Sequence, residues 1–405
     1  MQIQSSKCIH CKREVPKDKI RNGFCPSCYK TQFFPKQRKL LSKESFEGST
    51  PSPFVGRFGY PNINVGIMAV PEIEDATLHD APRYWASNHY DIPHVMDLRS
   101  GMINSNFNIN IRKRNKMLEI AQQVGMASKA ADVEINLKQK PVFRVNYSNV
   151  LAPTGPKAAL EKAELTSNVK VARQVDKAVS DTDLKSNSAL NLLFKKGFDE
   201  NFLSRLLSVG NLGVGKNRKL VPTRWSITAV DDNIGKDIIS EIKDYQTSDY
   251  CTYFGGYLGN YFLILTFPEV WSYELFETYV PTKAFATDYE PYSGRKTYAE
   301  NTAGGYYAAR LPILEKLKSI KRQGSILALR FITEEYTNPL GVFVVREAVR
   351  NSITSKPLVF ADKELMLAYA KSLVKKKFGY ELDIILKKSL LLKNIKQQSK
   401  LSRFF

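Results

Sequence analysis

Two pairs of cysteines in the first thirty residues have the spacing of metal ligands. The segment "CIHC" contains Cys8 and Cys11, and "CPSC" contains Cys25 and Cys28. Each Cys-x-x-Cys turn can present two thiolates to one ion, and the residues between the pairs close a small loop. Four thiolates arranged as a tetrahedron suit Zn²⁺ and leave no open coordination position. The sequence therefore predicts one structural zinc ion.

The role of this zinc module stays open between two alternatives. It either contacts nucleic acid or only organises the N-terminal part of the chain. Its surroundings are basic and favour contact with phosphate: Lys7, Lys12, Arg13, Lys17, Lys19 and Arg21. The fifth cysteine, Cys251, has no such partner and is expected to be a small buried hydrophobic residue.

Residues 398–405, "QSKLSRFF", form a second compact pattern. In a 3₁₀ turn, residues three apart lie on one face, so Leu401 and Phe404 would share a face with Phe405 beside them. Gln398 would lie one turn before Leu401. The pattern resembles the motif with which replication and repair proteins bind the sliding clamp (PCNA). The alternative is that the phenylalanines pack on the body of the protein, where a glutamine would have no evident role.

Histidines and aspartates are concentrated between residues 79 and 97. His79, His89 and His94 alternate with acidic residues, a density that could hold a catalytic divalent metal. No spacing typical of a metallohydrolase is present, so a surface loop is the alternative. The catalytic candidates are these three histidines together with Asp231 and Asp232.

Glycine-rich loops supply further candidates. The stretch 51–66 reads either as a structural turn or as a ligand-contacting loop with Arg57 and Asn64, and it is no P-loop. Arg295 and Tyr298 lie in a stretch rich in tyrosine, glycine and charge that could line a polar cleft. These four residues are the candidates for binding a cofactor.

The stretch 210–235 is both glycine-rich and basic. It is expected to precede a strand, so it does not fit a dinucleotide-binding fingerprint. Basic side chains and a tryptophan suit contact with a nucleic-acid backbone and stacking on bases. The candidate DNA contacts are Lys216, Arg218, Lys219, Arg224 and Trp225.

Helical and strand patterns alternate without a regular βαβ period, which indicates an α+β (irregular mixed α/β) body. Helices are expected at 114–132, 181–198, 199–210 and 362–396. Strands are expected at 224–230, 261–267, 325–332 and 342–349, the last two forming a hairpin. The expected organisation is a zinc module (1–34), a basic linker (35–53), a main domain (54–390) and a flexible C-terminal tail (391–405).

The net charge of +20 is concentrated at two ends of the sequence. Residues 1–45 and residues 371–405 each contribute +8, which leaves +4 for the rest. Basic ends suggest a polyanionic partner such as DNA, or an acidic clamp surface near the tail. No apolar run could span a membrane, and the cysteines do not resemble a secreted disulfide framework. The expectation is a cytoplasmic, nucleoid-associated protein with no membrane partner.

Several segments taken together resemble the archaeal Nre family over almost the whole chain. Besides the four cysteines and the motif at 398–405, they are "FVGRFGYPNINVG", "DAPRYW", "RKLVPTRWSITAVDD" and "GGYYAARL". The resemblance implies an archaeal DNA repair protein recruited by the sliding clamp, and it supplies no catalytic residue. The expected function is therefore a DNA-binding repair protein. The alternative is an enzyme, a metal-dependent nuclease or nucleotide-processing activity.

Overall fold

Two separate hydrophobic cores divide the chain into two units. A computed structural model describes residues 5–8, 11–16, 25, 28, 40–143 and 155–397. One unit comprises Met1–Ser226 with Asn338–Leu340, and the other comprises Ile227–Thr337 with Gly341–Phe405. The main domain expected at 54–390 is therefore two compact units. The tail motif at 398–405 lies outside the described residues.

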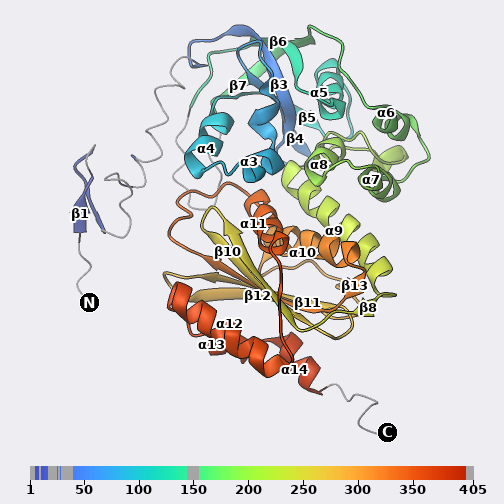
Figure 1. Cartoon of the computed structure of the whole chain (residues 1–405). Coiled ribbons are helices and arrows are strands. Elements are labelled where there is room, and N and C mark those ends of the chain that lie inside the picture. Colours follow the sequence, from blue (N-terminus) through green and yellow to red (C-terminus); the bar gives the residue numbers. More distant parts are fainter. Residues whose placement is uncertain are drawn as a thin grey trace. The chain divides into compact units, whose positions relative to one another are not determined.

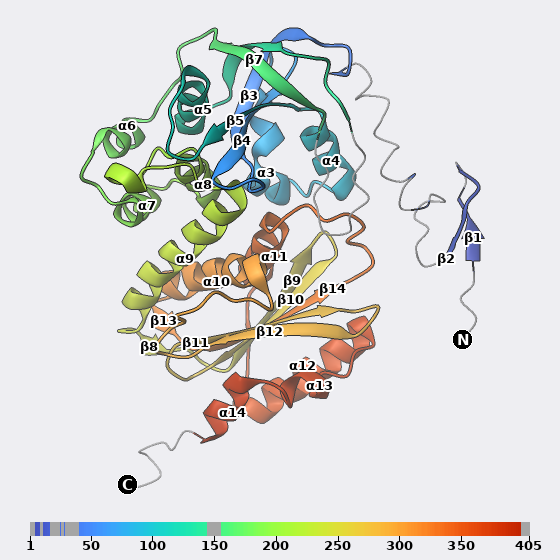
Figure 2. The ribbon, with the colours of Figure 1, turned by 180° about the vertical axis from the view of Figure 1, so that it is seen from behind.

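The N-terminal unit is built on a closed barrel of five strands, seen from two sides in Figure 1 and Figure 2. The order around the barrel is β3-β4-β5-β7-β6, and only the β5–β7 pair is parallel. Side chains alternate along β4, where Ile63 and Val65 are buried while Asn62 and Asn64 are exposed. The strands are β3 (Ser45–Val55), β4 (Asn62–Val70), β5 (Ile103–Asn110), β6 (Ala131–Leu137) and β7 (Lys157–Leu165).

Helix α5 (Lys116–Met126) connects β5 to β6 and completes the core of the barrel. Asn115 caps it by accepting a hydrogen bond from the backbone N–H of Leu118 at 2.8 Å. Leu118, Ala121 and Val124 from this helix join the buried barrel residues in one hydrophobic cluster. A barrel with this strand order, one parallel pair and a helix between its third and fourth strands has the topology of an OB fold.

The other helices of this unit surround the barrel. Arg205 of α8 is half-buried, donates to the backbone carbonyl of Pro51, and donates to that of Ala127 at 3.3 Å. It thereby satisfies a carbonyl of β3 where the β3–β4 register shifts. The helical elements around the barrel are the 3₁₀ turns η2 (Ala76–Asp80) and η3 (Gly215–Asn217), and the helices α3 (Pro82–Ser87), α4 (Ile92–Ser100), α6 (Arg173–Ser180), α7 (Ser186–Lys195) and α8 (Glu200–Ser208).

The C-terminal unit is a six-stranded mixed sheet with helices on both faces (Figure 1). Its order is β12-β11-β14-β10-β9-β15, and β11 and β14 are the parallel pair. These strands are β9 (Cys251–Tyr257), β10 (Asn260–Phe267), β11 (Ser272–Tyr279), β12 (Ala284–Glu290), β14 (Ser325–Ile332) and β15 (Leu358–Val359). A small parallel pair joins β8 (Gln246–Thr247) and β13 (Arg322–Gln323).

Each face of this sheet is covered by its own group of helices. One group consists of α9 (Thr223–Ile242), α10 (Ala303–Ser319) and α11 (Phe343–Thr354). The opposite face packs its leucines and phenylalanines against α12 (Lys363–Phe378), α13 (Asp383–Leu386) and α14 (Leu390–Gln397). Gly379 ends α12 in a left-handed conformation (φ 61°), which costs glycine little.

Buried Glu274 of β11 anchors the last described helix. Its carboxylate accepts hydrogen bonds from the hydroxyl of Ser389 at 2.5 Å and from the backbone N–H groups of Leu390 at 3.0 Å and Leu391 at 3.1 Å. Burial nonetheless raises the pKa of Glu274 above its ordinary value. The acid caps the N-terminus of α14, where backbone donors lack partners within the helix.

Two segments expected to be strands are helical. Residues 224–230 form the first part of α9, and residues 342–349 form most of α11, so the expected hairpin with 325–332 does not exist. Phe343 to Val349 are all buried. A short helix that is buried on all sides shows no one-sided apolar stripe, so periodicity cannot distinguish it from a strand.

Most of the other expected elements are confirmed, and two have different bounds. The strands at 261–267 and 325–332 are confirmed as β10 and β14, and the helices at 181–198, 199–210 and 362–396 as α7, α8 and α12–α14. The helix at 114–132 is shorter than expected because strand β6 already begins at Ala131. Part of the expected linker is also folded, since β3 begins at Ser45.

The packing of α5 yields a stability prediction for the barrel. Leu118→Ala should lower the free energy of unfolding of the N-terminal unit by about 2–5 kcal/mol, because it leaves a cavity in the core. Glu119→Ala, on the exposed side of the same helix turn, should change it by less than about 0.5 kcal/mol. Urea unfolding of both variants measures this difference, and equal effects would contradict the packing of α5 into the barrel.

Candidate functional site

The four N-terminal cysteines lie together as the sequence predicts. Their sulfur atoms all lie within 4.8 Å of one another, and those of Cys11 and Cys25 are 3.7 Å apart. Strands β1 (Ser5–Lys7) and β2 (Glu14–Pro16) pair as a hairpin whose turn contains Cys8 and Cys11. The backbone N–H of Cys28 points at the sulfur of Cys25 at 3.5 Å. The sulfur atoms of the two cysteine pairs thus face one another.

This geometry fits a tetrahedral thiolate site. A Zn–S bond of about 2.3 Å implies sulfur atoms about 3.8 Å apart in a tetrahedron, which matches the measured 3.7 Å between Cys11 and Cys25. A disulfide would need about 2.05 Å. Burial and the neighbouring thiols raise the pKa of Cys28 to about 12, and a cation would favour its thiolate form. The four cysteines can therefore hold one metal ion.

The three histidines do not gather into a second metal site. Among the described residues, the four cysteines form the one group of three or more metal-ligating side chains. His79 is half-buried, and burial lowers its pKa. His89 is exposed, and His94 is exposed and pairs with Asp91 at 2.8 Å. The three side chains therefore match the alternative of a surface loop and packing.

Arg57 and Asn64 lie on one side of the barrel. Arg57 is exposed in the turn between β3 and β4, with its guanidinium 5.0 Å from the ring centre of Phe58. Asn64 is exposed on β4 and accepts a hydrogen bond from the side chain of Asn108 at 3.3 Å. Within the stretch 51–66, residues 56–61 form a turn between β3 and β4, and ligand contact by Arg57 and Asn64 stays a prediction.

The candidate DNA contacts lie in a loop and in the first turn of α9. Lys216, Arg224 and Trp225 are exposed, while Arg218 and Lys219 are half-buried. Burial, followed by repulsion from Arg114, lowers the pKa of Arg218. A phosphate would relieve this repulsion. The loop does not feed a strand as expected, because Thr223 begins a helix.

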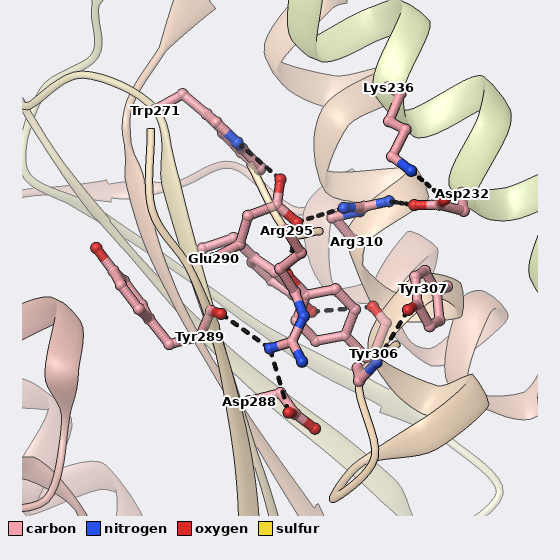
Figure 3. A network of polar contacts seen from close by, with 12 residues as sticks. Asp232, Lys236, Trp271, Asp288, Tyr289, Glu290, Arg295, Tyr306, Tyr307 and Arg310 are labelled. Carbon is pink, nitrogen blue, oxygen red and sulfur yellow. Dashed lines mark hydrogen bonds and ion pairs between the residues drawn. The ribbon is translucent and has the colours of Figure 1, made fainter. Parts of the chain in front are cut away.

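A buried network of charges occupies the C-terminal unit (Figure 3). Arg310 of α10 is fully buried, donates to Glu290 of β12 and donates to Asp232 of α9 at 2.7 Å. Figure 3 shows the guanidinium directed between the two carboxylates. A Cβ atom at Gly235 would lie 3.2 Å from this guanidinium, so the helix approaches it closely where it lacks a side chain.

Further hydrogen bonds fill the network around Glu290. Its carboxylate accepts from the hydroxyl of Tyr306 at 2.7 Å and from the indole N–H of Trp271 at 3.4 Å. Asp232 also accepts from Lys236 at 2.6 Å. A buried carboxylate and guanidinium with this many partners are mutually compensated. The arrangement explains how β12, α9 and α10 hold together without invoking a ligand.

The remaining predicted residues have structural contacts of their own. Arg295 pairs with Asp288 at 3.2 Å and donates to the backbone carbonyl of Tyr289 at 2.9 Å (Figure 3). It also donates to the backbone carbonyl of Tyr298 at 3.0 Å. Tyr298 stacks on Tyr307. Asp231 accepts from Arg346 at 2.7 and 2.8 Å. Cys251 is buried, as expected, and its burial raises its pKa.

Sequence reasoning missed one part of the barrel surface. Arg112, Lys113 and Arg114 follow β5 directly and are exposed. The signal was available, since "NSNFNIN" before them alternates polar and apolar residues as a strand does. Three basic residues at the end of that strand belong to the same side of the barrel as residues 56–62, because Ile111 N–H donates to the carbonyl of Pro61 at 3.0 Å.

The described chain combines a four-cysteine cluster that could hold a metal ion, an OB barrel with a basic flank and a mixed sheet covered by helices. These three parts define its class of protein. The family model described as archaeal Nre, N-terminal, matches residues 21–286, and the one described as archaeal Nre, C-terminal, matches residues 290–404. The chain belongs to the archaeal Nre family.

Curated relatives match the chain over most of its length. It is 36% identical to DNA repair protein NreA of Archaeoglobus fulgidus over 92% of this chain and 95% of the relative. DNA repair protein NreB of the same organism is 34% identical over 89% and 92%. DNA repair protein NreA of Haloferax volcanii is 34% identical over 79% and 80%. No solved structure matches the chain.

The cysteine geometry predicts one tightly bound metal ion per chain. Cys11→Ser and Cys28→Ser should each lose most of the ion, because a tetrahedral thiolate site requires all four sulfur atoms. Cys251→Ser is the matched control and should retain it, since this cysteine lies outside the cluster. Elemental analysis of the purified proteins gives both stoichiometry and metal. A full ion in Cys11→Ser would contradict the site.

The buried network predicts a large loss of stability on removal of one charge. Glu290→Gln should lower the free energy of unfolding of the C-terminal unit by about 3–5 kcal/mol, because Arg310 loses a buried counter-ion. Lys236→Ala removes an ion pair whose lysine is 59% exposed, so its loss should stay below about 1 kcal/mol. Denaturant unfolding separates the two variants. Similar losses would show that burial of the pair is not decisive.

Proposed function

We propose that this chain is a DNA repair factor that works on DNA encircled by the sliding clamp. The observation that carries the proposal is the family relationship, because three relatives at 34–36% identity over most of the chain are each named DNA repair protein. The surface of the chain is consistent with work on a polyanion, since its net charge is +20.

Residues 398–405 provide the clamp-binding part of the proposal. Gln398, Leu401, Phe404 and Phe405 have the order and spacing of a clamp-binding peptide, and such a peptide folds on binding. Lysines 393 and 396 lie beside it on α14 and would speed encounter with an acidic clamp surface. Binding there would raise the concentration of the two units at the DNA.

DNA contact is assigned to basic side chains in the N-terminal unit. Lys216, Arg218, Lys219 and Arg224, with Trp225, would engage phosphates and bases. The cysteine module would carry a structural Zn²⁺, which holds its hairpin in shape and exposes nearby Lys12 and Arg13. The chain would accordingly act in the cytoplasm, on the nucleoid.

The enzymatic alternative gains no support from the described residues. A metal-dependent nuclease needs carboxylate or histidine ligands with an open coordination position. The one group of three or more metal-ligating side chains among the described residues consists of four cysteines instead. The helices of the described part include none long and apolar enough to cross a membrane.

The tail assignment is tested by removing residues 398–405. Deletion, or Phe404→Ala with Phe405→Ala, should abolish binding to the sliding clamp of the same organism in calorimetry, because the hydrophobic side chains of the motif supply the main contacts. Ser402 lies between Leu401 and Phe404, and Ser402→Ala should leave the affinity for the clamp unchanged. Affinity of the truncated chain for DNA should also remain. Clamp binding by the truncated chain would refute the assignment.

A further inference from the structure

Three large aromatic side chains are exposed at one end of the barrel. Phe58 is 77% exposed, Tyr60 43% and Trp225 45%. Tyr60 and Trp225 lie with ring centres 5.3 Å apart and planes at 50°. They come from the β3–β4 turn and from the first turn of α9, which are joined where Val55 N–H donates to the Thr223 hydroxyl at 2.9 Å. Such a group of aromatic rings on a surface marks a binding site.

Beside these rings, the outer face of β4 and β5 carries a row of amides. Asn62 lies opposite Asn110 and Asn64 opposite Asn108 in the strand register. Their side chains hydrogen-bond to each other at 2.9 and 3.3 Å. Each amide has two donors and an acceptor with two lone pairs, so the row keeps capacity for further hydrogen bonds. Amides can read the edges of bases without adding charge.

Positive charge borders the same area on two segments. Residues 112–114 follow β5, and residues 218–219 run beside them because Leu220 N–H donates to the carbonyl of Ile111 at 3.1 Å. Within the described part of the chain, no ion pair involves Arg112, Arg114 or Arg218. Burial, followed by repulsion from Arg114, lowers the pKa of Arg218, and phosphate groups would offset that repulsion.

The barrel topology gives these three features a common position. In an OB barrel, the face of the second and third strands and the loop between the first two bind oligonucleotides. Here those elements are β4, β5 and the turn 56–61. The amides lie on the two strands, the aromatic residues Phe58 and Tyr60 lie in the turn, and the basic run follows the third strand.

We propose that this surface binds single-stranded DNA, with bases stacked on Phe58, Tyr60 and Trp225 and phosphates against residues 112–114 and 218–219. The proposal rests on the proposed DNA-repair function and deepens it by naming the form of DNA. Exposed rings favour an unpaired strand, because the flat faces of bases are accessible only outside a duplex. A duplex would offer this surface its phosphates alone.

Trp225 makes the binding directly observable in the full-length protein. The other two tryptophans, Trp85 and Trp271, are fully buried. Oligothymidylate of about 15 nucleotides should therefore quench tryptophan emission in a saturable way. Trp225→Phe should lose the quenching but keep affinity within about threefold in fluorescence polarisation, because phenylalanine still stacks.

Removing the rings tests the energetics of the surface. Trp225→Ala and Tyr60→Ala should each weaken binding of oligothymidylate about tenfold or more. Tyr84→Ala is the matched control, since Tyr84 is 45% exposed on α3 of the same unit, and it should bind as the unmodified chain does. The same oligonucleotide annealed as a duplex should bind more weakly, and its binding should be insensitive to both ring variants.

Several outcomes would overturn the inference while leaving the proposed repair role and the proposed clamp recruitment intact. These are binding of oligothymidylate without quenching of Trp225, equal or tighter binding of the duplex, and unchanged affinity in Tyr60→Ala and Trp225→Ala. Tighter binding of oligouridylate than of oligothymidylate would indicate that the surface binds RNA rather than DNA, which would also overturn the inference. Failure of the clamp-binding test with residues 398–405 concerns the proposed recruitment alone.

Discussion

The buried guanidinium of Arg310 is the constraint on which the C-terminal unit depends. A cation without water must be neutralised, and here Glu290 and Asp232 do so from two different elements. Arg346 and Asp231 repeat the arrangement in the same unit. Strand β12 and helices α9, α10 and α11 must therefore be in place together, which favours one arrangement of this face of the sheet over alternatives of similar hydrophobic content.

Local patterns in the sequence predicted those parts of the fold whose determinants are local. The cysteine spacing predicted the four-cysteine cluster, and the helices expected at 199–210 and 362–396 end close to glycines, Gly210 after α8 and Gly379 after α12. Residues 342–349 were misassigned because a helix surrounded by the protein shows no polar face. The barrel was missed for a different reason, since its closure depends on pairing β3 with β6 and β5 with β7 across long stretches of chain.

The candidate site shows the same division. Arg57 and Trp225 are candidates from two separate stretches of the sequence, but the contact of Tyr60 with Trp225 depends on how residues 220–225 contact the barrel. Asp231 and Arg310 are charged residues in predominantly apolar stretches of the sequence, and Asp231 is one of the predicted catalytic candidates. In the structure each is paired with an opposite charge, which accounts for its presence by packing.

The anchoring of α14 by Glu274 limits how far the chain can reach. The predicted clamp motif begins at Gln398, directly after the last residue of α14, so no linker separates them. Even a fully extended chain would place Leu401 no more than about 14 Å from Gln397. A clamp bound there would keep the C-terminal unit close to it, within a restricted range of orientations. Inserting residues between Gln397 and Gln398 would then widen the range of positions of the C-terminal unit, while its affinity for the clamp would stay the same.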